Sequence, residues 1–276
     1  MVFSKIQDIT KLNDISYEVR KDILCMLAEA ESGHTGGSLG LADVFTCLYF
    51  SVMDHDTENP LWIDRDRLIL SIGHVAPVLY ATLANVGYFP KAELLTLRNI
   101  GSRLQGHPSR EQGLPGIELS SGSLGQGLSV AVGIALAAKM DSRNYFIYCI
   151  MGDGEIQEGS VWEAAMSAAH YRLENLIGII DRNKLQIDGK TSNVMEVEPL
   201  KDKWKSFGWS VIECDGNNHV EILSSFEQCK KLNNKPHIII ANTLMGKGVR
   251  EIENNNLWHG KAPTKSQAAQ FISMLE

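Results

Sequence analysis

The sequence lacks an apolar run long enough to cross a membrane. A membrane-spanning helix needs about 18 consecutive apolar residues, and no such stretch occurs among the 276 residues. The beginning of the chain, MVFSKIQDITKLNDISYEVR, carries charges every few positions and has no apolar centre like that of a secretory signal. We therefore expect a cytoplasmic protein that makes no contact with membranes.

The sequence also lacks an excess of positive charge. Its 26 Lys and Arg residues are outnumbered by 33 Asp and Glu residues, which gives a formal net charge of -7, and no basic run stands out. Because nucleic-acid binding depends on basic patches that neutralise phosphates, we expect no nucleic-acid partner. A ligand that carries phosphate would have to be bound locally.

Cysteine is scarce and irregularly placed. The five cysteines lie in apolar stretches and show no CxxC spacing. An odd number of scattered cysteines suits reduced thiols in a core better than disulfides or a zinc site. They are residues 25, 47, 149, 214 and 229.

From Tyr145 onward the sequence alternates apolar runs with segments of helical spacing. Strands that are apolar throughout indicate a parallel sheet covered by helices on both faces, which is an α/β fold. The expected strands are residues 66–74, 145–151, 175–181, 209–215 and 237–242, and the expected helices between them are residues 160–173, 200–208 and 219–232.

The first half of the chain is mainly helical in its spacing. Apolar residues recur every three or four positions in four segments, and a short closing helix is expected at residues 264–276. No repeat, low-complexity tract or linker interrupts the chain, so we expect a single domain over residues 1–276. The four helical segments are residues 8–30, 38–53, 75–88 and 122–140.

A turn rich in glycine and acidic residues stands between a strand and a helix. The stretch GDGEIQEGSVWEA places Gly152 and Gly154 where backbone must approach a ligand closely, at the positive end of a helix dipole. Both features favour a phosphate or diphosphate. Asp153 would repel such a ligand unless a cation lay between them, so this turn indicates a diphosphate that is held through a metal ion.

The end of the next strand supplies a second oxygen ligand. Asn183 follows Asp181 in IIDRNKLQ, and a carboxylate, an amide oxygen, a backbone carbonyl and phosphate oxygens make a coordination set suited to Mg²⁺. Taken singly, GDG is more often an ordinary tight turn and Asn183 a turn residue or cap. Their placement at consecutive strand ends favours the metal site.

The eight histidines fall into two groups. In the first, each histidine lies beside a glycine in a loop, where an imidazole can reach into a crevice and transfer protons near neutral pH. This group is His34, His74, His107 and His259. The second group has no such setting, and we expect it to be structural, with His55 in a surface turn. It is His55, His170, His219 and His237.

Together these motifs resemble transketolases, which use thiamine diphosphate. The spacing from GDG to Asn183 is similar to the thiamine diphosphate signature, and further pieces follow in the family's order between residues 32 and 260. They are SGHTGGSLG, SIGHVAPVLY, LQGHPS, SSGSLGQGLSVAVGIA, NLIGIIDRNKLQIDG and WHG.

The resemblance implies roles for particular residues. Mg²⁺, or Ca²⁺ or Mn²⁺ in its place, would be held by Asp153, the side chain of Asn183 and the backbone carbonyl of Leu185. The cofactor would be contacted by Gly154, His74, the main chain of Gly122, Ser123 and Leu124, and His259, which would lie between cofactor and substrate. The substrate would be contacted by His34 and His107.

Three glutamates follow the GDG turn. Glu158 and Glu163 resemble family residues that meet a partner chain in a hydrogen-bonded network beside the cofactor. For Glu155 we expect only a favourable interaction with the helix dipole.

The resemblance covers only the first of the three transketolase domains. It implies that the pyrimidine-binding and C-terminal domains lie on a second chain, that activity needs this partner, and that the assembly is an α2β2 heterotetramer. A fragment of a longer enzyme is the alternative. The reaction implied is transfer of a two-carbon ketol unit from a ketose or ketose phosphate to an aldose or aldose phosphate, as in the pentose phosphate pathway. Donors with a sulfonated, branched or deoxy tail stay open.

Two other functions stay open. GDG and Asn183 also occur in the α-subunits of 2-oxo acid dehydrogenases, although SGH, GHPS and WHG argue against that class. A cofactor-binding subunit without catalytic activity is the second alternative.

Overall fold

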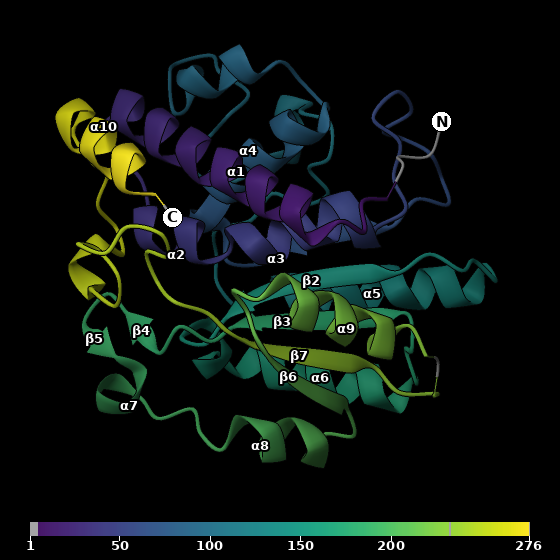
Figure 1. Ribbon diagram of the computed structural model, residues 1–276. Coiled ribbons are helices and arrows are strands. Elements are labelled where there is room, and N and C mark those ends of the chain that lie inside the picture. The colour runs from purple at the N-terminus through teal and green to yellow at the C-terminus, as the bar shows by residue number, and fades with distance from the viewer. Residues whose placement is uncertain (1–4, 232, 276) are drawn as a thin grey trace.

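A five-stranded parallel sheet forms the centre of the molecule in the computed structural model, which describes residues 5–231 and 233–275. All five expected strands are present, and the strand order is β1-β2-β3-β7-β6 (Figure 1). Their bounds are β1 Arg67–Leu70, β2 Ile147–Gly152, β3 Leu176–Asp181, β6 Ser210–Asp215 and β7 His237–Asn242.

Helices cover both faces of this sheet. In β2, Tyr148 and Ile150 belong to a core shared with the N-terminal helices and α9 (His219–Cys229), whereas Cys149 and Met151 belong to a second core. The second core is completed by α5 Gly127–Met140, α6 Gly159–His170 and α8 Leu200–Ser206. The predicted α/β fold is confirmed.

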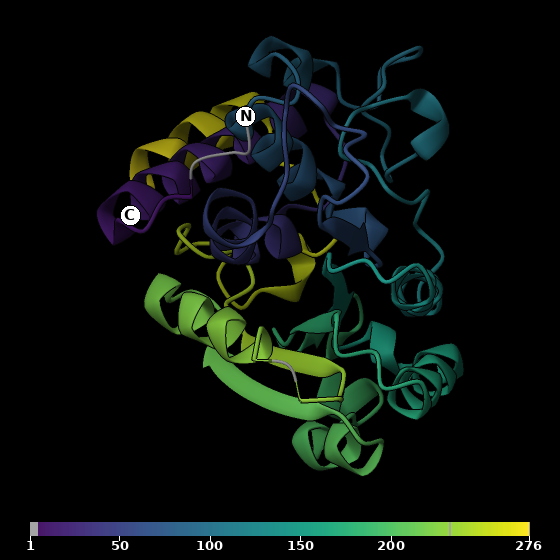
Figure 2. The same cartoon turned by 90° about the vertical axis from the view of Figure 1, so that its right-hand side faces the viewer.

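The N-terminal helices form a layer of their own above the sheet (Figure 1). The long helix α1 (Ile9–Ala30) starts at the cap Asp8, whose side chain accepts the N–H groups of Thr10 and Lys11. Helix α10 (Lys265–Met274) packs beside α1 and begins with a capping box of Thr264 and Gln267 (Figure 2). The other elements of this layer are α2 Thr35–Gly40, α3 Ala42–Cys47, the π-helix η1 Leu48–Val52, α4 Ala76–Val86, and the 3-10 helices η2 Gly73–Val75, η3 Lys91–Thr96 and η4 Arg110–Gln112.

Two expected helices have different bounds. The helix expected over residues 38–53 is divided at Leu41 into α2 and α3 and ends as a π-helix. The helix expected over residues 122–140 begins only at Gly127, because Gly122 (φ +142°) and Gly125 (φ +81°) have left-handed backbone angles that a right-handed helix excludes. Four other helices end two or three residues early, at Val86, His170, Ser206 and Cys229. Leu232 and Glu276, the expected last residues of two helices, lie outside the described residues.

The segment after β3 contains elements that were not expected. A two-stranded antiparallel hairpin, β4 Leu185–Gln186 and β5 Gly189–Lys190, is followed by the short helix α7 Thr191–Val194. Strands of two residues are too short to produce an apolar period. The hairpin lies beside the candidate site, because it begins directly after Asn183.

His55 is not in a surface turn, so that prediction is wrong. Its ring is buried, with Nε2 2.7 Å from the carbonyl of Tyr49 and Nδ1 3.2 Å from the hydroxyl of Tyr88. All five cysteines fall within the described residues and are free thiols, four of them buried, as expected.

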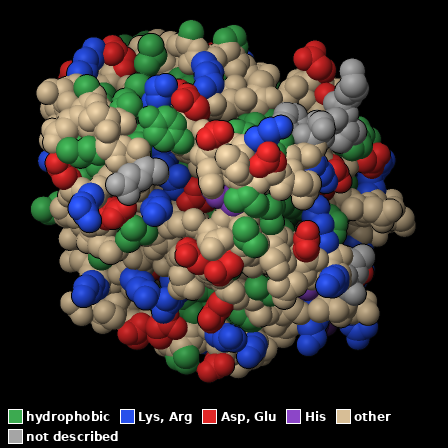
Figure 3. Space-filling view, in the orientation of Figure 1, with side chains coloured by type: hydrophobic (Ala, Val, Ile, Leu, Met, Phe, Trp, Pro, Cys, Tyr) green, Lys and Arg blue, Asp and Glu red, His purple; other side chains and the backbone are tan. Residues whose placement is uncertain are grey.

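Acidic and basic side chains alternate over the surface seen in Figure 3, which carries no broad field of one sign. No helix of the described residues combines the length and apolar character needed to cross a membrane.

Candidate active site

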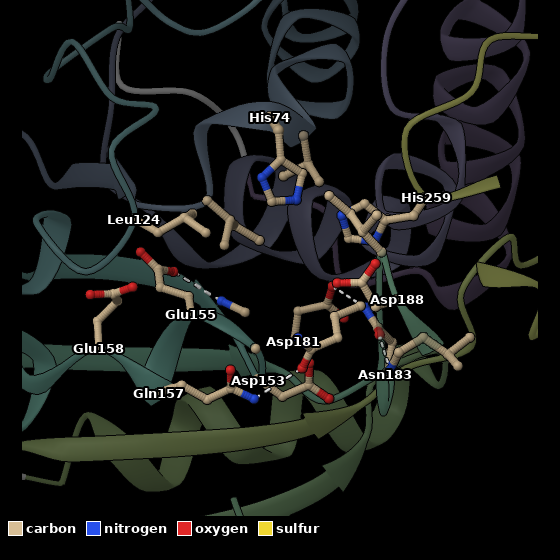
Figure 4. Close-up of a pocket in the computed structure, with 18 residues that line it drawn as sticks. His74, Leu124, Asp153, Glu155, Gln157, Glu158, Asp181, Asn183, Asp188 and His259 are labelled. Carbon is tan, nitrogen blue, oxygen red and sulfur yellow. Dashed lines mark hydrogen bonds between the residues drawn. The ribbon is translucent and has the colours of Figure 1, made fainter. Parts of the chain in front are cut away.

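A cleft opens at the carboxyl ends of β1, β2 and β3, which is where parallel sheets bind ligands. Its volume is about 270 Å³. His74 and His259 lie on one side of it, and Asp153, Asp181 and Asn183 on the other (Figure 4). Of the residues expected in the site, eight line the cleft: His74, Leu124, Asp153, Gly154, Glu158, Asn183, Leu185 and His259.

Asp153 is a buried carboxylate with only 2% of its surface exposed. Its Oδ2 accepts the backbone N–H of Lys184 at 2.6 Å. Burial, followed by the nearby carboxylate of Asp181, raises the pKa of Asp153 to about 7. A cation beside this carboxylate would offset the cost of its buried charge, so the environment of Asp153 fits a metal ligand.

Asn183 is oriented by hydrogen bonds on both ends of its amide. Its Nδ2 donates to Asp181 Oδ2 at 2.9 Å, and its Oδ1 accepts the N–H of Leu185 at 2.9 Å. The amide oxygen keeps a second lone pair for a ligand. Asp181 was not predicted to have a role; its one signal in the sequence is an acidic residue at the end of an apolar strand.

The donors present fit a cation of the Mg²⁺ type. Among the described residues, no three or more His, Cys, Asp or Glu side chains are grouped to hold a metal ion. A metal in this cleft would therefore depend on Asp153, neutral oxygens and the oxygens of a bound phosphate, and Mg²⁺ is commonly bound by few carboxylates together with substrate phosphates.

Three of the four expected histidines form one cluster. Ring centroids are 4.8 Å apart for His34 and His74, 5.2 Å for His74 and His259, and 5.8 Å for His34 and His259. Burial and the neighbouring imidazoles lower the pKa of His34 to about 4 and that of His74 to about 3, and burial lowers the pKa of His259. The three rings are therefore neutral at pH 7.

Two nitrogens of this cluster are left without a hydrogen-bond partner among the described residues. The Nδ1 atoms of His34 and His259 are buried and have no hydrogen-bond partner within the described part of the chain. Buried polar atoms are nearly always paired in folded proteins. These nitrogens belong to a cluster of which His74 and His259 line the cleft, so water or a bound molecule would have to complete them.

His107 lies outside the cluster, and its ring packs against the loop that carries Gly122. A Cβ atom added to Gly122 would stand only 3.1 Å from Cδ2 of His107, so ring and loop are in contact. The imidazole is exposed, and partial burial and Arg98 lower its pKa. Ser123 is exposed on the same loop.

The glutamates after the GDG turn differ in environment. Glu158 and Glu163 are exposed, and of these two Glu158 alone lines the cleft. The prediction for Glu155 is wrong, because this side chain does not act through the dipole of α6. It lies in the 3-10 helix η5 (Glu155–Gln157), is buried, and hydrogen-bonds to three other segments of the site.

Residues 15–274 match the family described as the thiamine diphosphate binding domain of transketolase. The chain is 45% identical over 253 residues to one of the subunits of apulose-4-phosphate transketolase from Phocaeicola vulgatus, covering 92% of this chain and 89% of that one. It is 46% identical over 258 residues to a 6-deoxy-6-sulfo-D-fructose transketolase subunit of a Clostridium species, covering 94% of each chain.

Longer relatives match over part of their length. Human transketolase is 38% identical over 267 residues, which are 96% of this chain and 42% of the human protein. The crystal structure of transketolase from Campylobacter jejuni superposes with a TM-score of 0.90 at 33% identity, covering 97% of this chain and 43% of that one. The chain therefore belongs to the transketolase family and carries its thiamine diphosphate-binding domain.

Proposed function

We propose that this chain is the diphosphate-binding subunit of a split transketolase, which transfers a two-carbon ketol unit from a ketose to an aldose with thiamine diphosphate and Mg²⁺. One observation carries the proposal. The Asp153 and Asn183 loops face the cluster of His34, His74 and His259 across a single cleft. A metal-bound diphosphate and a polar substrate would each find complementary groups there.

The metal would be held by the side chains of Asp153 and Asn183 and the carbonyl of Leu185, with Ca²⁺ or Mn²⁺ as substitutes. The raised pKa of Asp153 supports this role, because a cation would relieve the cost of its buried charge. Gly154 and the main chain of Gly122, Ser123 and Leu124 would contact the cofactor. His74 would lie beside its diphosphate.

When bound, thiamine diphosphate supplies the carbon nucleophile that takes up the ketol unit. His34, His107 and His259 would position the sugar and exchange protons with its hydroxyl and carbonyl oxygens. The low pKa values of His34 and His259 keep them neutral, so each ring can accept one hydrogen bond and donate another. The unpaired Nδ1 atoms of both rings support this assignment.

The partner would be a second chain that carries the pyrimidine-binding domain. Two similar relatives are named as transketolase subunits and are nearly the length of this chain, whereas this chain spans 42% of human transketolase. These lengths favour a split enzyme, which we expect to assemble as an α2β2 heterotetramer. Because those relatives are named for a sugar phosphate and a sulfonated sugar, we expect a ketose donor with an anionic tail.

The test is to mix the purified chain with its partner, cofactor and Mg²⁺, and to offer ketose donors with phosphate, sulfonate or no anionic tail. Mass spectrometry should show an aldose two carbons shorter than the donor and a ketose two carbons longer than the acceptor. Oxidative decarboxylation of a 2-oxo acid without ketol transfer would favour a dehydrogenase subunit instead. Cofactor binding without turnover of any donor would favour a non-catalytic subunit.

A further inference from the structure

The carboxylate of Glu155 lies where three loops of the cleft meet. Only 2% of the residue is exposed. The first loop follows β1 and contains Ser71, the second comprises residues 122–127, and the third runs from Gly152, the last residue of β2, into the turn that carries Glu155 itself. Glu155 lies beside Leu124 in Figure 4, on the same side of the cleft as Glu158.

Each loop donates a hydrogen bond to this carboxylate. Oε1 accepts the hydroxyl of Ser71 and the backbone N–H of Gly125, the latter at 2.8 Å, and Oε2 accepts the N–H of Gly152 at 3.1 Å. The Ser71 hydroxyl in turn accepts the N–H of Gly127 at 3.1 Å. One carboxylate therefore joins all three loops.

The loops are also too close for side chains between them. A Cβ atom added to Gly127 would stand 2.4 Å from Cβ of Ser71, and one added to Gly73 would stand 2.7 Å from the backbone nitrogen of Gly122. Direct backbone contact and the bonds to Glu155 thus set the spacing of the loops. Small displacements there would move Leu124 and His74, which line the cleft.

The same loop reaches the exposed edge of the site. The carbonyl of Gly125 accepts the hydroxyl of Ser160 at 3.0 Å, and a Cβ atom added to Gly125 would stand 2.7 Å from Cβ of Glu158. Glu155 therefore supports both the wall of the cleft and the edge that presents Glu158.

We propose that Glu155 is a positioning residue that holds the loop of residues 122–127 in register with the Gly152–Asp153–Gly154 turn, so that the two walls of the diphosphate site are formed before the cofactor arrives. The use of these walls for a diphosphate depends on the function proposed above; the positioning itself does not. Glu155 touches neither metal nor substrate in this assignment. Its effect is on cofactor affinity, through the loops it joins.

Glu155→Gln tests this with little change in shape. A carboxylate accepts on both oxygens, whereas an amide has one accepting oxygen and one NH₂ group. In either orientation the NH₂ group would face a donor, either the N–H of Gly152 or the groups at Oε1. An unsatisfied buried donor is costly, so the loops should separate.

Asp66→Asn is the matched control. Asp66 is also buried, at the opposite end of β1, and its carboxylate accepts the backbone N–H groups of Asp54 at 2.9 Å and Phe146 at 2.7 Å. Both variants are expected to lower the melting temperature. Only Glu155→Gln should alter the cofactor site.

Two measurements separate positioning from general stability. Hydrogen exchange of the chain alone should be faster in Glu155→Gln at residues 122–127 and 152–155, and unchanged there in Asp66→Asn. In the complex with the partner, Glu155→Gln should weaken the apparent affinity for thiamine diphosphate about tenfold, while turnover at saturating cofactor stays near that of the unmodified enzyme. If Glu155→Gln does not fold, Ser71→Ala, which removes one of the three donors, should show the same changes at smaller size.

Unchanged hydrogen exchange at residues 122–127 and 152–155 in a folded Glu155→Gln variant would overturn the positioning role. An equal loss of cofactor affinity in Asp66→Asn would overturn it as well. If the unmodified complex did not bind thiamine diphosphate with Mg²⁺, the proposed function would fail. The exchange measurement on the chain alone would still decide the role of Glu155.

Discussion

At the residue scale, the proposed metal site depends most on the side chain of Asp153. We predict that Asp153→Ala abolishes Mg²⁺-dependent binding of thiamine diphosphate in the assembled enzyme, because it removes the carboxylate that would join the protein to the metal. Isothermal titration calorimetry with and without Mg²⁺ measures this. Asp188→Ala is the control, since Asp188 is an exposed acidic residue that lines the same cleft. Normal cofactor affinity in Asp153→Ala at low Mg²⁺ would rule out the metal assignment.

The histidine cluster should make folding sensitive to acid. His74 has a pKa lowered from 6.5 to about 3 in the folded chain, so below about pH 6.5 the unfolded chain binds a proton that the folded chain does not. The stability that the neutral ring of His74 contributes is complete above pH 6.5 and is lost as the pH falls toward 3. The raised pKa of Asp153, about 7, acts in the opposite direction. The effect of His74 on the free energy of unfolding is therefore measured by comparing the unmodified chain with a variant that lacks this imidazole.

We predict that His74→Gln loses less stability than the unmodified chain when the pH is lowered from about 7 to about 5. Urea denaturation of the isolated chain at several pH values measures the free energy of unfolding. His170→Gln is the control, because His170 is exposed at the end of α6. Parallel curves for His74→Gln and the unmodified chain would contradict the lowered pKa.

That the candidate residues would share one cleft was easier to predict than their interactions. Glycine neighbours and strand ends pointed to Asp153, Asn183, His74 and His259, which the structure brings to the same cleft. The sequence did not indicate that Asp181 orients the amide of Asn183, nor that Glu155 binds three loops, because these partners come from segments far apart in the chain. An acidic residue that completes such a network has the same local pattern as one that favours a helix start.

At the element scale, the strands were predicted more reliably than the helices of the first layer. Each strand is an apolar run whose burial on both faces is visible locally. The break between α2 and α3 lies at a remote contact, since a Cβ atom on Gly40 would stand 3.0 Å from the carbonyl oxygen of Leu244. Periodicity within residues 38–53 carries no information about that contact.

The turn after β1 gives a test at this scale. We predict that Gly73→Ala lowers both stability and cofactor affinity, because the added Cβ would stand 2.7 Å from the backbone nitrogen of Gly122 and 2.8 Å from the carbonyl carbon of Ser121. Backbone atoms cannot rotate away, so the loop must move, at a cost of roughly 1–3 kcal/mol. Chemical denaturation and calorimetry measure the two effects.

Gly133→Ala is the control for this substitution. Gly133 lies in α5 with no atom within 4 Å of an added Cβ, so alanine there should stabilise the chain by up to about 1 kcal/mol through helix propensity. A Gly73→Ala variant as stable as Gly133→Ala would show that the contact between the two loops is not tight.

At the scale of the whole molecule, the cleft is bordered by exposed apolar side chains. Ile187, which lines the cleft, is 66% exposed, and Leu257 is 74% exposed. The two segments are joined, because Asn256 Nδ2 donates to the carbonyl of Ile187 at 3.0 Å. Apolar side chains beside a binding cleft are typical of a surface that another chain covers. This arrangement is consistent with a cofactor held between two subunits.

We predict that the isolated chain has no detectable ketol transfer at any cofactor concentration and that mixing it with its partner restores activity. A cofactor that contacts both chains binds the assembled state more tightly, so it must strengthen assembly by linkage. A ligand at about 100 times its dissociation constant contributes about 2.7 kcal/mol, which is about a hundredfold in the assembly equilibrium. Light scattering after size-exclusion chromatography, with and without thiamine diphosphate and Mg²⁺, measures this shift.

Asp153→Ala is the control for this prediction, because it removes the proposed metal ligand and leaves the contact between the chains unchanged. Its subunits should still associate, but their association should no longer respond to the cofactor. Ketol transfer by the chain alone, or assembly that is indifferent to the cofactor in the unmodified protein, would contradict the split-subunit proposal.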